Sequence, residues 1–168
     1  MTFDNCFEII MKYEGGYSND SLDPGGETKW GISKRAYPNL NVKELTLDNA
    51  KQIYKIDYWD RTHCDLLSAD IRLIVFDCAI NQGVARASIY LQRSVGINSD
   101  GVLGPITMSA LRQVEPQSFI VKYAGLRHES YTKNPRWNIY GKGWSARLLD
   151  VTMKSLIYSS ALSVARKP

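Results

Sequence analysis

The N-terminal half of the chain is organised around one stretch, KYEGGYSNDSLDPGGETKWGIS, which occupies residues 12–33. Three apolar residues precede it at intervals typical of one helix face: Phe3, Phe7 and Ile10. The pattern predicts a helix over about residues 3–13, and Glu14 continues the apolar series at its end. A carboxylate on that face loses hydration, which favours the protonated form that a general acid needs. The alternative is a polar last turn that Gly15 and Gly16 simply close.

The residues after Glu14 predict a turn followed by a small β element. Residues 23–26, Asp-Pro-Gly-Gly, indicate a turn, because proline restricts φ and glycine permits positive φ. Thr28, Trp30 and Ile32 then alternate with other residues, which is typical of a short strand or a small hairpin.

The remainder of the chain is predicted to be helical. Periodicity, caps and helix breakers indicate helices over about residues 46–59, 71–80, 85–95, 105–113, 118–131 and 144–164. Residues 71–80 are apolar on nearly every side, so this helix is expected at the centre of the molecule. The predicted fold class is therefore α+β, mainly α, with about seven helices and one small N-terminal β element.

The composition limits the kind of protein. At 168 residues and 19.0 kDa, the chain can form one good core or two small lobes that share one. Its net charge of +4 favours an anionic partner such as nucleic acid, a membrane surface or a cell-wall polymer. The basic residues are scattered, so no nucleic-acid tract is indicated. Cys6, Cys64 and Cys78 lack a metal-binding spacing and are expected to be buried thiols, and no metal or cofactor is predicted.

The N-terminal residues do not resemble a signal peptide. They carry acidic side chains and lack a basic start and a long apolar core. No apolar stretch approaches the length of a membrane span, so stable membrane insertion is not expected. We expect the protein to fold in a reducing cytoplasm and to need another route if it acts outside.

The acidic residues near Glu14 are typical of glycoside hydrolysis. That reaction needs an acid for the leaving oxygen and commonly a second carboxylate. Asp20 and Asp23 follow Glu14 in the turn, and Thr28 carries a hydroxyl that can hold a water. The alternative is that Asp20 and Asp23 only hydrogen-bond their own backbone as turn residues.

Aromatic and amide side chains are the other candidates, because sugars present apolar ring faces and many hydroxyls. The candidate substrate-binding residues are Tyr17, Asp20, Tyr58, Asn81 and Trp137. Trp137 is expected in a loop over residues 134–141. Trp30, Trp59 and Trp144 are expected in the core, since tryptophan in a regular element is more often buried than exposed.

Short motifs run in register through the first half of the chain. They are EGGY at 14–17, ND at 19–20, DPGG at 23–26, Thr28, GIS at 31–33, Tyr54, YWD at 58–60 and FDxxxNxG at 76–83. With them, residues 3–90 resemble glycoside hydrolase family 108, N-acetylmuramidases found as bacteriophage and prophage endolysins. The second half is similar to the predicted peptidoglycan-binding segment that accompanies this family. It carries LQ at 91–92, DG at 100–101, GP at 104–105, Thr107 and GWxxR at 143–147.

The resemblance implies a lysozyme-like fold and makes Glu14 the catalytic acid, with Asp23 and Thr28 as supporting candidates. It implies a catalytic lobe over residues 1–90 and a helical peptidoglycan-binding-like lobe over 91–168, packed as one compact unit. The implied reaction is hydrolysis of the β-1,4 bond between N-acetylmuramic acid and N-acetylglucosamine in peptidoglycan glycan strands, by a monomer. A holin pore would release it from the host cytoplasm to the cell wall or periplasm. The alternatives are a lytic transglycosylase and a non-catalytic wall-binding or secretion-assisting protein.

Overall fold

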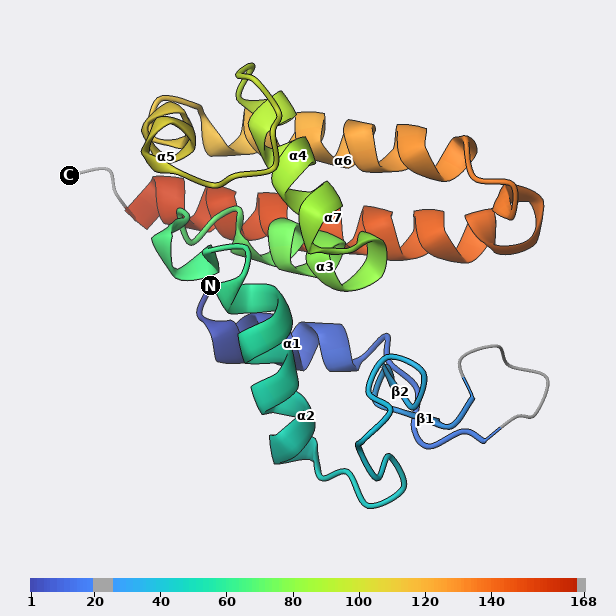
Figure 1. The fold of residues 1–168 in the computed structure, drawn as a ribbon. Coiled ribbons are helices and arrows are strands. Elements are labelled where there is room, and N and C mark those ends of the chain that lie inside the picture. Colours follow the sequence, from blue (N-terminus) through green and yellow to red (C-terminus); the bar gives the residue numbers. More distant parts are fainter. Residues whose placement is uncertain (20–25, 166–168) are drawn as a thin grey trace.

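The computed structural model describes residues 1–19 and 26–165, which contain seven α-helices and one two-stranded sheet (Figure 1). The elements in chain order are α1 Phe3–Met11, β1 Thr28–Lys29, β2 Ile32–Ser33, α2 Leu47–Tyr54, a π-helix Lys55–Asp60, a 3₁₀-helix Cys64–Leu66, α3 Arg72–Gln82, α4 Val84–Ser94, α5 Pro105–Leu111, α6 Pro116–Thr132 and α7 Trp137–Ala165. The predicted mainly α, lysozyme-like α+β class is confirmed.

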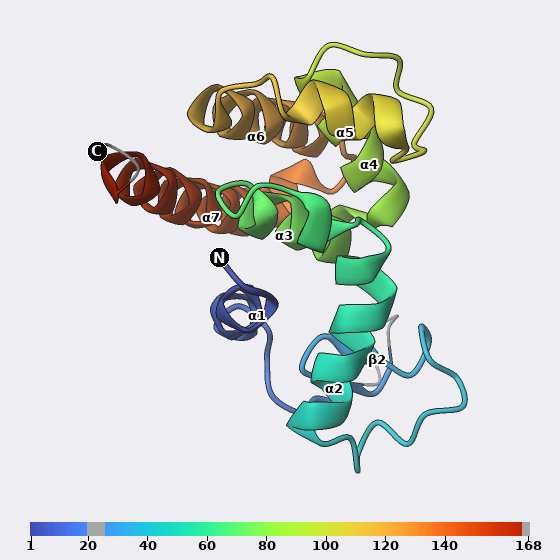
Figure 2. The same cartoon turned by 90° about the vertical axis from the view of Figure 1, so that its left-hand side faces the viewer.

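Helix α3 lies at the centre of the fold, as its apolar sequence predicts. Every residue from Leu73 to Ala79 is buried, because α1, α4, α6 and α7 all contact this helix. Figures 1 and 2 show α3 between the small N-terminal elements and the long pair formed by α6 and α7. None of the helices in residues 1–19 and 26–165 is long and apolar enough to cross a membrane.

Helices α1 and α2 begin where the sequence predicts but end earlier than predicted. Thr46 caps α2 through its hydroxyl, which accepts from the Asn49 backbone N–H at 3.2 Å. Helix α2 then gives way to a π-helix that buries Trp59 completely. Helix α1 ends at Met11, two residues before the predicted end. Glu14 therefore follows the helix instead of occupying its last turn.

The predicted β element is a hairpin. β1 pairs antiparallel with β2, and the chain reverses between them at Trp30 and Gly31. Both turn residues have positive φ, 48° and 74°, as tight hairpin turns with the right-handed strand twist require. Residues 28–32 therefore do not form one continuous strand, because a turn at Trp30 and Gly31 separates two short ones.

Helix α7 begins seven residues before the predicted start. Trp137 is its first residue, so the expectation that Trp137 lies in a loop is wrong. Its ring packs over Gly141, where an added Cβ would lie 2.5 Å from the indole. The absence of a side chain at Gly141 lets the indole pack along the helix and supports the two extra turns.

A buried ion pair joins α3 to α6. Asp77 Oδ2 accepts from Arg127 Nη2 at 2.7 Å, and both side chains are 0% exposed. The same guanidinium donates from Nε to Gln82 Oε1 at 3.0 Å and from Nη2 to Tyr131 Oη at 3.1 Å. These hydrogen bonds offset the free-energy cost of desolvating the two charges. A buried ion pair without such additional hydrogen bonds does not recover that cost.

Replacing Asp77 tests this pair. We expect Asp77→Ala to lower the free energy of unfolding by about 3–5 kcal/mol, because it leaves a buried guanidinium without its carboxylate. Urea unfolding measures the change. The control is Lys51→Ala, which removes the solvent-exposed Lys51–Asp4 pair and should leave the midpoint unchanged. Equal midpoints for the two variants would contradict the assignment.

Candidate active site

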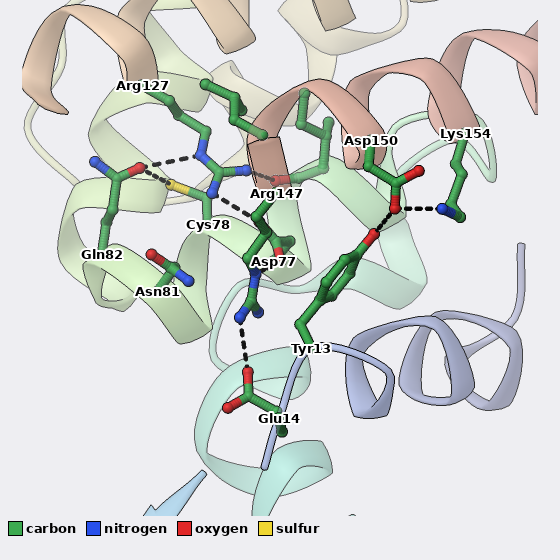
Figure 3. Close-up of polar contacts among 12 residues, drawn as sticks. Tyr13, Glu14, Asp77, Cys78, Asn81, Gln82, Arg127, Arg147, Asp150 and Lys154 are labelled. Carbon is green, nitrogen blue, oxygen red and sulfur yellow. Dashed lines mark hydrogen bonds and ion pairs between the residues drawn. The ribbon is translucent and has the colours of Figure 1, made fainter. Parts of the chain in front are cut away.

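Glu14 lies where the segment after α1 meets α7. Arg147 of α7, 133 residues further along, donates from Nη1 to Glu14 Oε1 at 2.9 Å (Figure 3). The two side chains are 15% and 14% exposed, so the pair is largely shielded from water but not sealed. The sequence suggested an apolar setting for this carboxylate. Its immediate partner is instead a cation.

Arg147 is itself held on two further sides. Its Nε donates to Asp77 Oδ1 at 2.8 Å, and its guanidinium lies 4.9 Å from the centroid of the Tyr13 ring. Tyr13 is held in place by a hydrogen bond from its hydroxyl to Asp150. Burial acts to lower the pKa of Arg147, but Asp77 and Glu14 outweigh it, and the pKa lies above its ordinary value.

Four side chains from four segments thus form one line of alternating charge. It runs Glu14, Arg147, Asp77, Arg127, and Figure 3 shows it crossing from the end of α1 through α7 and α3 to α6. When all four groups are ionised, their two positive and two negative charges sum to zero. Arg147 and Asp77, the two inner residues of this line, each have a partner of opposite charge on both sides. Two partners orient a side chain more firmly than one does.

The other oxygen of Glu14 faces the hairpin. A Cβ added at Gly31 would lie 2.5 Å from Glu14 Oε2 and 2.5 Å from the Tyr54 hydroxyl, so only glycine fits there. The Tyr54 hydroxyl donates to the Trp30 carbonyl at 3.0 Å. Burial and then the charge of Glu14 raise the pKa of Tyr54, so its hydroxyl stays protonated. Oε1 and Oε2 therefore have different surroundings.

A hollow of about 360 Å³ adjoins the ion pair on the α7 side. Tyr13, Gly143, Ala146 and Arg147 line it. Gly143 and Ala146 contribute little side-chain volume, and a Cβ added at Gly143 would meet no atom within 4 Å. Arg147 thus stands beside open space, one hydrogen bond away from the Glu14 carboxylate.

The residues predicted to accompany Glu14 are only partly placed. Asp20 and Asp23 lie outside the described residues. Thr28 is half-buried in β1, where its hydroxyl donates to the Gly26 carbonyl at 3.1 Å. Its backbone bridges to Ser18 on one side and pairs with Ser33 on the other. Its hydroxyl is thus hydrogen-bonded within its own loop.

The predicted substrate-binding residues are spread over the molecule. Tyr17 is 45% exposed and donates to Glu27 at 2.7 Å, while Tyr58 packs on Tyr54 at 5.6 Å between ring centroids. Asn81 is exposed at the end of α3, one turn beyond Asp77, and accepts from Tyr131 at 3.4 Å. Trp137 meets the His128 ring edge-on at 5.6 Å and belongs to the α6–α7 contact. Its place is consistent with packing between these helices.

The sequence marked Arg147 within the GWxxR motif but did not pair it with Glu14. Asp77 offered a signal, because a carboxylate within an apolar helix must find a cation or hydrogen-bond donors. That signal predicts a partner but does not say which arginine provides it. Both Arg127 and Arg147 contact Asp77, and Arg147 alone reaches on to Glu14.

Two glycine substitutions separate backbone strain from the close approach at Glu14. Gly26 and Gly31 have similar positive φ angles, 67° and 74°, but a Cβ at Gly26 would meet nothing within 4 Å. We expect Gly31→Ala to lower the free energy of unfolding by about 1–3 kcal/mol more than Gly26→Ala, the range typical of overpacking. Urea titration of both variants measures the difference. Equal losses would mean that the hairpin does not press on Glu14.

Comparisons with known proteins identify a matching family and a similar solved structure. Residues 7–83 match the family model described as Glycosyl hydrolase 108. The solved structure of Brucella abortus SagA is similar over 94% of this chain and 95% of its own, with 32% sequence identity and a TM-score of 0.86. Among curated proteins no sequence match was found. The matched region contains Glu14, Gly31 and Asp77, while Arg147 lies beyond it. On the family match and the SagA similarity together, the chain belongs to the glycosyl hydrolase 108 family.

Proposed function

We propose that this glycoside hydrolase acts on peptidoglycan and cleaves the β-1,4 bond between N-acetylmuramic acid and N-acetylglucosamine, with Glu14 as general acid. The observation that carries the proposal is the placement of Glu14 in a chain of this family. Its carboxylate is oriented by Arg147 on one oxygen and faces Gly31 with the other, and Arg147 lines an open hollow.

The two oxygens have separate roles in this mechanism. Because Arg147 donates to Oε1, the proton for the glycosidic oxygen is carried by Oε2. Proton transfer leaves Glu14 ionised, and the adjacent guanidinium stabilises that charge as it develops. An interaction that grows stronger toward the transition state accelerates the chemical step. Arg147 thus favours release of the proton from Glu14 during the reaction.

Two kinds of group can attack the sugar in this mechanism. We expect a water oriented by Asp23, Thr28 or both, or an internal acetamido or 6-hydroxyl group of the sugar. The stereochemical outcome follows from the separation of the two carboxylates. We further expect the protein to reach the wall from the cytoplasm through a holin pore, as a monomer whose basic charge holds it on an anionic wall.

A lytic transglycosylase is the second candidate. It needs one carboxyl group, and within residues 1–19 and 26–165 the charged partner of Glu14 is Arg147 and not a second acid. Product mass separates the two reactions, because hydrolysis adds water and transglycosylation closes an anhydro ring without it. A non-catalytic wall-binding protein would sediment with peptidoglycan and release no reducing ends.

Glu14→Gln tests the proposed acid. The amide cannot donate a carboxyl proton, so we expect the release of reducing ends from purified peptidoglycan to fall by about 10²–10⁴-fold. The matched control is Glu8→Gln on the exposed face of α1, which should retain activity. Thermal unfolding checks that both variants fold. Lysis at the wild-type rate by folded Glu14→Gln protein would exclude Glu14 as the acid.

Arg147→Lys tests the orienting cation. Lysine keeps the charge but has no planar fork, so it cannot contact Asp77 and Glu14 together in the arginine geometry. We expect kcat to fall by about 10–100-fold while KM changes little, because misplacing a reacting group affects the chemical step. Arg112→Lys, at an exposed position after α5, is the control. A rise in KM with unchanged kcat would assign Arg147 to substrate binding instead.

A further inference from the structure

A second hollow, of about 440 Å³, lies between α4 and α6. Arg86 and Arg93 enter it from α4, seven residues and thus two turns apart, which places them on one face of that helix. Lys133 enters from the residue that caps the end of α6. Two packed helices therefore aim three cations at one space.

The charge of the hollow is not balanced from within. Its one acidic lining residue, Glu129, pairs with Lys133 at 2.5 Å, and this hydrogen bond is the main cause that lowers the pKa of Glu129. Three cations less one carboxylate leave a net charge of +2 on the lining. In the described part of the chain, neither Arg86 nor Arg93 forms an ion pair, in contrast to Arg127 and Arg147.

Tyr90 and Leu126 add aromatic and aliphatic surface to a lining that is otherwise largely polar. Tyr90 is 6% exposed, and Leu126 is half-buried and packs against the core. A small inorganic anion would use the arginines and leave these two side chains unused. The combination instead suits a ligand with an aliphatic body and carboxylates, because arginine pairs with carboxylate through two parallel hydrogen bonds.

The hollow and the network that orients Glu14 use some of the same helices. Leu126 is the neighbour of Arg127 on α6, and Gln82, which accepts from Arg127 Nε, precedes Arg86 by four residues. Both features therefore use α6 and the corner between α3 and α4, which Figure 1 shows as adjacent elements. A ligand in the hollow would rest on the frame that holds the candidate acid.

We propose that the hollow between α4 and α6 binds the carboxylate-bearing peptide stem of peptidoglycan. The proposal rests on the proposed function, since it concerns the same substrate. Arg86 and Arg93 receive the stem carboxylates, and Tyr90 and Leu126 contact its aliphatic side chains. The site adds binding energy through a part of the substrate remote from the bond that breaks, so it acts on KM.

Binding is tested without turnover in the full chain carrying Glu14→Gln. Calorimetric titration with a soluble N-acetylmuramyl tetrapeptide should show saturable binding. Adding Arg86→Ala and Arg93→Ala should weaken it by at least about tenfold, because each removes a charge-assisted hydrogen bond. Arg112→Ala, an exposed arginine outside the hollow, should have no effect. An unchanged affinity in the double variant, or equally tight binding of inorganic phosphate, would overturn the proposal.

Turnover provides the second measurement. In the active enzyme, Arg86→Ala with Arg93→Ala should raise KM on intact peptidoglycan several-fold and leave kcat unchanged. On glycan strands from which an amidase has removed the stems, wild type and double variant should be indistinguishable. Equal losses on both substrates, or no loss on intact peptidoglycan, would overturn the stem site. Failure of wild type to cleave intact peptidoglycan would count against the proposed function, whereas the titration reports on the stem site independently.

Discussion

Asp77 between two arginines is the constraint on which the rest of the structure depends. Its carboxylate is fully buried, and a buried charge is tolerated only when opposite charges and hydrogen bonds surround it. Arg127 from α6 binds one oxygen of this carboxylate, and Arg147 from α7 binds the other. The central helix is thereby held to both long helices, and the second arginine is left directed at Glu14.

The candidate acid therefore gets its orientation from distant parts of the chain. Arg147 approaches one oxygen of Glu14 from α7, and the hairpin turn at Gly31 closes on the other. Tyr13, held by Asp150, supports the guanidinium from a third side. A carboxyl group confined in this way loses little entropy when it meets substrate, which is the advantage of preorganisation. The cation also explains how a partly exposed glutamate can be kept in place without an apolar pocket.

Local features were predicted well where the governing interaction is local. The cap at Thr46 and the buried run of α3 depend on side chains a few positions apart. Prediction failed where distant contacts decide. Helix α1 stops before Tyr13, whose hydroxyl bonds Asp150 of α7. Helix α7 starts at Trp137, which packs on His128 of α6. The division into lobes at residue 90 and the roles of Asp23 and Thr28 stay predictions.

The sequence by itself determined the fold class, the order of most helices and the choice of Glu14 as the candidate acid. Periodicity, caps, turn residues and a family resemblance are all contained in short stretches of chain. Only the tertiary structure decided what Glu14 touches, because its partner is 133 residues away and other arginines offer the same chemistry. The packing of α7 against α3 selects Arg147 from among them. No pattern in the neighbourhood of Glu14 encodes that choice, since it depends on the whole core being formed.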